Sequence, residues 1–105
     1  MKNSEILRKA KALIDTPEKW CQETYAANAY GASVEIRNPA ACSFCSTGAL
    51  IKVLGGYWDS YKYPVYFGMT PKQLFDFNDS HAHAEVMALW DKAIERAERE
   101  EKCAT

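Results

Sequence analysis

The sequence predicts an α+β fold: a single, mostly helical domain of about four or five helices with one β-hairpin. Apolar residues recur every three or four positions over residues 6–14 and again over residues 82–97, which is typical of helices that pack by one face. Over residues 22–36 the helical period disappears, and two short runs flank a turn-forming sequence, as in a hairpin. Asn or Thr followed directly by Pro marks three further helix starts, because these side chains cap a helix and Pro fits its first turn.

The composition predicts one folded domain over residues 1–105. Hydrophobic residues make up 48% of the chain and charged residues 26%, which is close to the average of soluble domains. The sequence E-R-E-E-K near the end is charged on every helical face, so residues 99–105 are expected to form a disordered tail. No apolar run approaches about 18 residues, and the N-terminal residues do not resemble a signal peptide. We therefore expect a cytoplasmic protein without a membrane partner.

The first two helices follow from caps and an apolar stripe. Asn3 or Ser4 is expected to cap the first helix, which docks through the stripe within residues 6–14. Thr16, followed by proline, then predicts a short second helix that reaches Trp20. Trp20 is expected to anchor this part of the chain in the core.

The middle of the chain is predicted to hold the hairpin and a central helix. Residues 23–27 and 33–36 are the expected strands, and residues 28–31 are the turn between them. Asn38-Pro39 is expected to start the third helix, and Gly55 to end it by supplying a left-handed conformation.

The last third combines an aromatic loop with two helices. Residues 57–67 are rich in aromatic residues and are expected to form a loop folded onto the core. Thr70 and Gln73 match a capping box, in which each side chain bonds to the other residue's backbone amide, and predict a short fourth helix. The apolar stripe of residues 82–97 predicts the final helix.

Cys42 and Cys45 form a Cys-x-x-Cys pair that invites a metal or redox interpretation. Thiolate and imidazole suit tetrahedral zinc, so His81 and His83 are the candidate partners of these cysteines at a zinc site. However, residues two apart on a helix point roughly 200° apart, and the cysteines are embedded in apolar sequence. We therefore expect them to pack in the core and expect no cofactor, with a zinc- or thiol-dependent enzyme as the alternative.

The aromatic segment is the candidate binding surface. Tyrosine and tryptophan dominate the energetics of protein interfaces, and half of the rings in residues 57–67 are expected to be exposed. The candidate partner-binding residues are Tyr57, Trp58, Tyr61, Tyr63 and Tyr66. The expected partner is another protein or a second copy of the chain. A nucleic acid is disfavoured because the net charge is -1 and no basic cluster accompanies the rings.

Five short motifs carry a resemblance that covers nearly the whole chain. They are P-E-K-W at residues 17–20, Gly31, F-C-S-T-G-A-L at residues 44–50, F-N-D at residues 77–79 and A-I at residues 93–94. Their order resembles a family of small bacterial and phage domains known only as a domain of unknown function. The resemblance implies a mostly helical fold with an inserted hairpin, and it implies no established activity, substrate or cofactor.

Two of these motifs have a physical interpretation as packing elements. Gly48 is expected to let another element approach the central helix closely, because it has no side chain. Asn78 and Asp79 are expected to cap and bend the junction between the fourth and fifth helices. In the absence of a catalytic motif, the sequence predicts a non-enzymatic accessory protein that interacts with another protein.

Overall fold

A computed structural model describes residues 1–104 and confirms the α+β class. In that range it contains four α-helices, α1 (Asn3–Ala12), α2 (Ser46–Leu54), α3 (Pro71–Ser80) and α4 (His83–Cys103). The remaining elements are three 3-10 helices, η1 (Pro17–Lys19), η2 (Trp58–Lys62) and η3 (Pro64–Phe67), and two short strands, β1 (Ala26–Ala27) and β2 (Ser43–Phe44).

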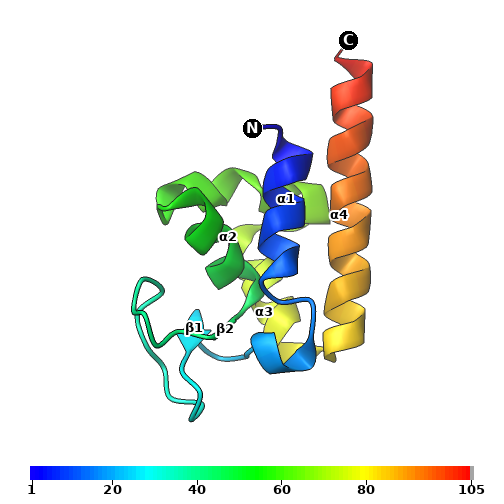
Figure 1. The fold of residues 1–105 in the computed structure, drawn as a ribbon. Coiled ribbons are helices and arrows are strands. Elements are labelled where there is room, and N and C mark those ends of the chain that lie inside the picture. Colours follow the sequence, from blue (N-terminus) through cyan, green and yellow to red (C-terminus); the bar gives the residue numbers. More distant parts are fainter. Residues whose placement is uncertain (105) are drawn as a thin grey trace.

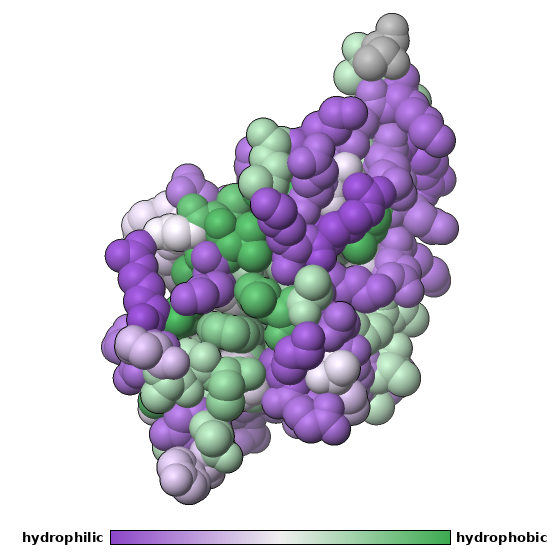
Figure 2. Space-filling view, in the orientation of Figure 1, coloured by the Kyte–Doolittle hydropathy of each residue, from purple (hydrophilic) through white to green (hydrophobic). Residues whose placement is uncertain are grey.

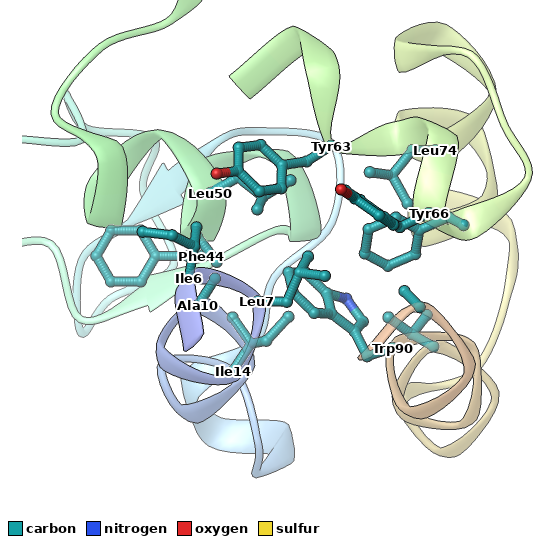
Figure 3. Packing of buried hydrophobic residues seen from close by; sticks show 14 of the residues in the cluster. Ile6, Leu7, Ala10, Ile14, Phe44, Leu50, Tyr63, Tyr66, Leu74 and Trp90 are labelled. Carbon is teal, nitrogen blue, oxygen red and sulfur yellow. The ribbon is translucent and has the colours of Figure 1, made fainter. Parts of the chain in front are cut away.

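The helices surround a single core. α1 packs against both α2 and α4, the strands lie near the opposite end from the two termini, and α4 projects past the other elements (Figure 1). The core includes Leu7 of α1, Ile14 just after that helix, Leu50 of α2 and Trp90 of α4, which Figure 3 shows in close packing. The Phe67 ring meets the Trp90 ring edge to face, with their centroids 4.9 Å apart. The apolar stripes that predicted α1 and α4 are therefore the faces that bury the core.

The antiparallel strand pair is present, but its second strand is not the predicted one. Ala26 pairs with Phe44 and Ala27 with Ser43, whereas Ser33 forms only an isolated bridge with Ala27. The predicted turn at residues 28–31 does form. The predicted second strand at residues 33–36 does not form. β2 pairs with β1 in its place.

The central helix starts later than predicted. Asn38-Pro39 forms a turn, in which Ala41 N donates to Asn38 O at 2.9 Å, and α2 begins only at Ser46. The residues between this turn and α2 include β2, and Cys42 N, just before that strand, donates to Ala27 O at 3.0 Å. The helix does end as predicted, at Gly55, whose φ is 78°.

The aromatic segment folds onto the core, as predicted, but as the two 3-10 helices η2 and η3 rather than as an irregular loop.

The capping box of α3 is confirmed: Gln73 N donates to Thr70 Oγ1 at 3.2 Å, and Thr70 N donates to Gln73 Oε1 at 2.9 Å.

The chain is helical in most of the region where the sequence predicts a disordered tail. α4 continues from His83 to Cys103, and Ser4 at the start of α1 donates two hydrogen bonds to Glu101, from Oγ at 2.7 Å and from N at 3.0 Å. The last residue, 105, lies outside the described residues. Hydrophilic residues cover much of this helix, and hydrophobic residues gather in the middle of the same face of the molecule (Figure 2). Within residues 1–104, no helix has the length and apolar surface needed to cross a bilayer.

Candidate functional site

A buried polar network around Asn78 holds the N-terminus of α2. Asn78 Oδ1 accepts hydrogen bonds from Trp20 Nε1 at 2.8 Å and from both N and Oγ of Ser46 at 2.9 Å. Asn78 Nδ2 donates to Cys21 O at 3.1 Å, and Trp90 Nε1 donates to Ser46 Oγ at 3.0 Å. An unmade hydrogen bond in such a network is costly, so the network fixes the relative positions of these segments.

The network joins three of the motifs that carry the family resemblance. Trp20 comes from P-E-K-W, Ser46 from F-C-S-T-G-A-L and Asn78 from F-N-D. The sequence predicted a structural role for Asn78, but at the junction of the last two helices. Asn78 instead bonds to Ser46, the first residue of α2, which is 32 positions away in the chain.

Gly48 allows Tyr25 to lie directly against α2. A Cβ atom at Gly48 would be 2.0 Å from the Tyr25 carbonyl oxygen, far closer than any real contact. That oxygen also accepts a hydrogen bond from Cys45 N at 3.2 Å. The prediction that Gly48 permits a close approach is confirmed, and the position of Tyr25 depends on it.

From Tyr25, a series of five aromatic rings extends across the surface. The centroids lie 5.5 Å apart between Phe75 and Tyr25, 6.1 Å between Tyr25 and Tyr57, 5.1 Å between Tyr57 and Tyr61, and 5.4 Å between Tyr61 and Trp58. Tyr57, Trp58 and Tyr61 expose 38%, 77% and 40% of their surface. Most of these contacts are edge to face, a favourable arrangement that holds the rings in place. We call these five rings the aromatic surface.

The aromatic surface borders a groove of about 480 Å³, whose lining includes Tyr25, Tyr57, Tyr61 and Phe75. Thr47 also lines this groove and is only 9% exposed. Within residues 1–104, the Thr47 hydroxyl has no hydrogen-bond partner. A buried hydroxyl in this state costs about 1–3 kcal/mol.

The hydroxyl group of Tyr57 is polarised by two neighbouring tyrosines. It accepts hydrogen bonds from Tyr25 at 3.4 Å and from Tyr61 at 2.8 Å. These two bonds lower the pKa of Tyr57, whereas the bonds to Tyr57 raise the pKa of Tyr25 and that of Tyr61. Neither bond uses the hydroxyl proton of Tyr57 itself, and the two accepted bonds strengthen this hydroxyl as a donor.

A second, larger depression of about 830 Å³ shares Tyr25 and Tyr57 with the groove. It is lined by the segment that leads to α2, including Glu35 and Arg37, and by Gly55 at the end of that helix. Arg37 is already bonded to the Gly55 carbonyl. Four of the five rings of the aromatic surface line the smaller groove and only two line this depression, which makes the smaller groove the better candidate site.

Two of the predicted partner-binding residues are not on this surface. Tyr63 is 2% exposed and Tyr66 is 8% exposed, and Figure 3 shows both rings among core residues. Their hydroxyls bond to the Asn3 side chain, and Tyr66 also donates to Glu100 Oε1 at 2.6 Å. Both rings are therefore core residues and are not part of the aromatic surface: the first three rings of the segment are exposed, and the last three are buried.

Sequence reasoning missed three residues of the site. The sequence analysis placed Tyr25 in a strand and Phe75 in the fourth helix, and it assigned neither residue a role in binding. Phe75 lies four positions after Pro71, so both are on one face of α3 and both line the groove. Thr47 could have been noticed because it is a polar residue in the largely apolar segment F-C-S-T-G-A-L.

The proposed metal ligands are dispersed. Cys45 is buried, as expected, whereas Cys42 is exposed, so the expectation that both cysteines pack in the core is wrong for Cys42. His81 stacks on Phe77 with centroids 3.6 Å apart, and His83 Nε2 lies 2.7 Å from the carbonyl of Ile14. Among residues 1–104, no group of three or more His, Cys, Asp or Glu side chains is arranged to hold a metal ion.

Cys45 caps α2 instead, and this role predicts a pH dependence of stability. Its Sγ accepts a hydrogen bond from Gly48 N at 3.2 Å, and burial raises the pKa of the thiol from 9.0 to about 12. Above pH 9 the unfolded chain releases this proton while the folded protein keeps it. The free energy of unfolding should therefore fall by about 1.4 kcal/mol per pH unit as the pH rises from 9 towards 12.

Cys45→Ser is the matched variant, because serine keeps a capping group and does not ionise in this range. Urea unfolding just below pH 9 and about one unit above it should show a smaller loss for this variant than for the wild type. Tyrosine ionisation is common to both proteins, so equal losses would contradict the assignment.

These features define a small α+β domain with an aromatic surface on a rigid scaffold. The sequence profile of a family of unknown function (DUF6197) matches residues 1–96, and the chain belongs to that family. No curated protein and no solved structure matches the chain.

Proposed function

We propose that this domain is a non-enzymatic accessory protein that binds another protein through the aromatic surface. The observation that carries the proposal is the exposure of Tyr57, Trp58 and Tyr61 as one ordered cluster. Tyrosine and tryptophan contribute most of the binding energy at many interfaces, and rings that are already ordered lose little entropy on binding. The thiol of Cys45, with its raised pKa, is unsuited to nucleophilic chemistry.

We further propose that it works in the cytoplasm of a bacterium, either as a host protein or as a phage protein. All four cysteines are free, and Cys42 and Cys103 are exposed. Exposed free thiols persist in a reducing compartment, which supports this location. The family resemblance supports the source.

Alanine variants test the interaction. A tagged domain would be used to capture proteins from cells of the source organism, with quantification by mass spectrometry. We expect the double variant Trp58→Ala, Tyr61→Ala to recover at least about tenfold less of a specific partner, because hot-spot rings each contribute 2 kcal/mol or more. Trp58 is 77% exposed and Tyr61 is 40% exposed, and neither belongs to the buried core, so the variant should fold normally.

Tyr30→Ala is the control, because Tyr30 is 95% exposed and is not part of the aromatic surface. This variant should recover the partner as the wild type does. Identical partner lists for the wild type and the double variant would refute the proposal. Light scattering on the purified protein completes the test, since a dimer that the double variant loses would identify the partner as a second copy.

A further inference from the structure

We propose that the partner of the aromatic surface is a second copy of this chain, related to the first by a two-fold axis. The inference rests on the proposed function, since it names the partner of the same surface. Two features that lie together on this surface carry it, and each is complementary to itself. One is a pair of opposite charges, and the other is an exposed ring beside a groove.

The 3-10 helix η2 arranges its side chains in three rows. Such a helix has about three residues per turn, so side chains three positions apart lie in one row. Ser60 and Tyr63, the residue that follows η2, form the inner row, and each is only 2% exposed. Trp58 and Tyr61 form the second row, with ring centroids 5.4 Å apart. Burial of the first row therefore turns the other two towards solvent.

The third row carries one charge of each sign. Asp59 and Lys62 are both exposed, and the ion pairs within residues 1–104 join other side chains. In a two-fold dimer, residue i of one copy contacts residue j of the other, and residue j of the first contacts residue i of the second. This symmetry allows Asp59 of each copy to meet Lys62 of the other. The row is thus complementary to itself in charge.

The exposed ring and the groove are complementary in the same way. Trp58 is 77% exposed and packs on Tyr61, which lines the groove, whereas Trp58 itself does not line it. At about 480 Å³, the groove is of a size that holds small ligands and therefore an aromatic side chain. Because the ring and the groove are neighbours on one surface, a two-fold rotation brings Trp58 of each copy to the groove of the other.

The charge of the groove and of the whole chain also favours a second copy. Lys72 is the only charged residue in the lining, and it is paired with Asp76 at 2.8 Å. The groove therefore suits an apolar ring better than a charged segment or a phosphate group. The net charge of the chain is -1, so two copies repel each other only weakly.

Sedimentation velocity of the full chain over a range of concentrations tests the inference. The wild type should pass from monomer to dimer as the concentration rises. Trp58→Ala should raise the dissociation constant of the dimer at least about tenfold, because the ring that enters the groove is lost. Tyr30→Ala should leave the constant unchanged. A wild type that remains a monomer at millimolar concentration, or a Trp58→Ala variant that dimerises as tightly as the wild type, would overturn the proposal.

Charge reversal tests the two-fold arrangement itself. In a dimer of Asp59→Lys two lysines face each other, and in a dimer of Lys62→Asp two aspartates do, so each variant should dimerise at least about tenfold more weakly than the wild type. An equimolar mixture of the two variants should dimerise again, because every contact then joins opposite charges. Single variants that dimerise like the wild type, or a mixture that dimerises no better than either variant alone, would refute the arrangement.

The two proposals fail separately. A monomeric wild type whose captured partner is lost on Trp58→Ala, Tyr61→Ala would reject the second copy and leave the proposed function standing. A monomeric wild type with no partner that depends on these rings would reject both.

Discussion

Asn78→Ala should lower the free energy of unfolding by about 4 kcal/mol. The asparagine oxygen accepts three hydrogen bonds, two from Ser46 and one from Trp20. Alanine offers none, so these largely buried donors lose both the partner and any access to water, at a cost of about 1–3 kcal/mol each. Urea unfolding followed by circular dichroism measures the change.

Asn38→Ala provides the comparison for this variant. Asn38 also bonds to backbone amides, but in an exposed turn, through a 2.8 Å bond from Ala40 N. Its replacement should cost about 1 kcal/mol or less. If the Asn78 variant were no less stable than the Asn38 variant, the network would not hold the scaffold together.

Gly48→Ala is the second variant with a large expected effect. The new Cβ atom would meet the Tyr25 carbonyl oxygen at 2.0 Å, so the backbone at Tyr25 and α2 must separate. Overpacking of this kind typically costs about 1–3 kcal/mol, and we expect the upper end because the obstacle is backbone rather than a flexible side chain. The variant should also displace Tyr25 and thereby disturb the aromatic surface, which the near-ultraviolet circular dichroism of the tyrosines would report.

Gly56→Ala is the matched control. A Cβ atom there would lie 3.1 Å from the end of the Asp59 side chain, which is free to move. This substitution should change stability by less than about 1 kcal/mol. Equal effects of the two substitutions would show that close approach to Tyr25 is not what Gly48 provides.

Local sequence signals predicted the elements that depend on local interactions. The capping box at Thr70, the left-handed end at Gly55 and the apolar stripes of α1 and α4 all involve residues within a few positions of each other. Asn38-Pro39 misled because the same pair starts either a helix or a turn. The outcome was decided by the pairing of β2 with β1, which local sequence does not encode.

The candidate site was only partly predictable for the same reason. Tyr57, Trp58 and Tyr61 were visible as an aromatic run, but their separation from Tyr63 and Tyr66 depends on how the 3-10 helices turn. Tyr25 precedes β1, Thr47 lies in α2 and Phe75 lies in α3. Only the folded chain brings them to one groove.

The claim that the aromatic surface is the binding site is tested most directly by site-specific photo-crosslinking in cells of the source organism. A photoreactive phenylalanine derivative would replace Trp58 in one protein and Tyr30 in another, since both positions are highly exposed. We predict a discrete crosslinked partner from position 58 and none from position 30. No crosslinked product from position 58, or the same products from both positions, would contradict the account.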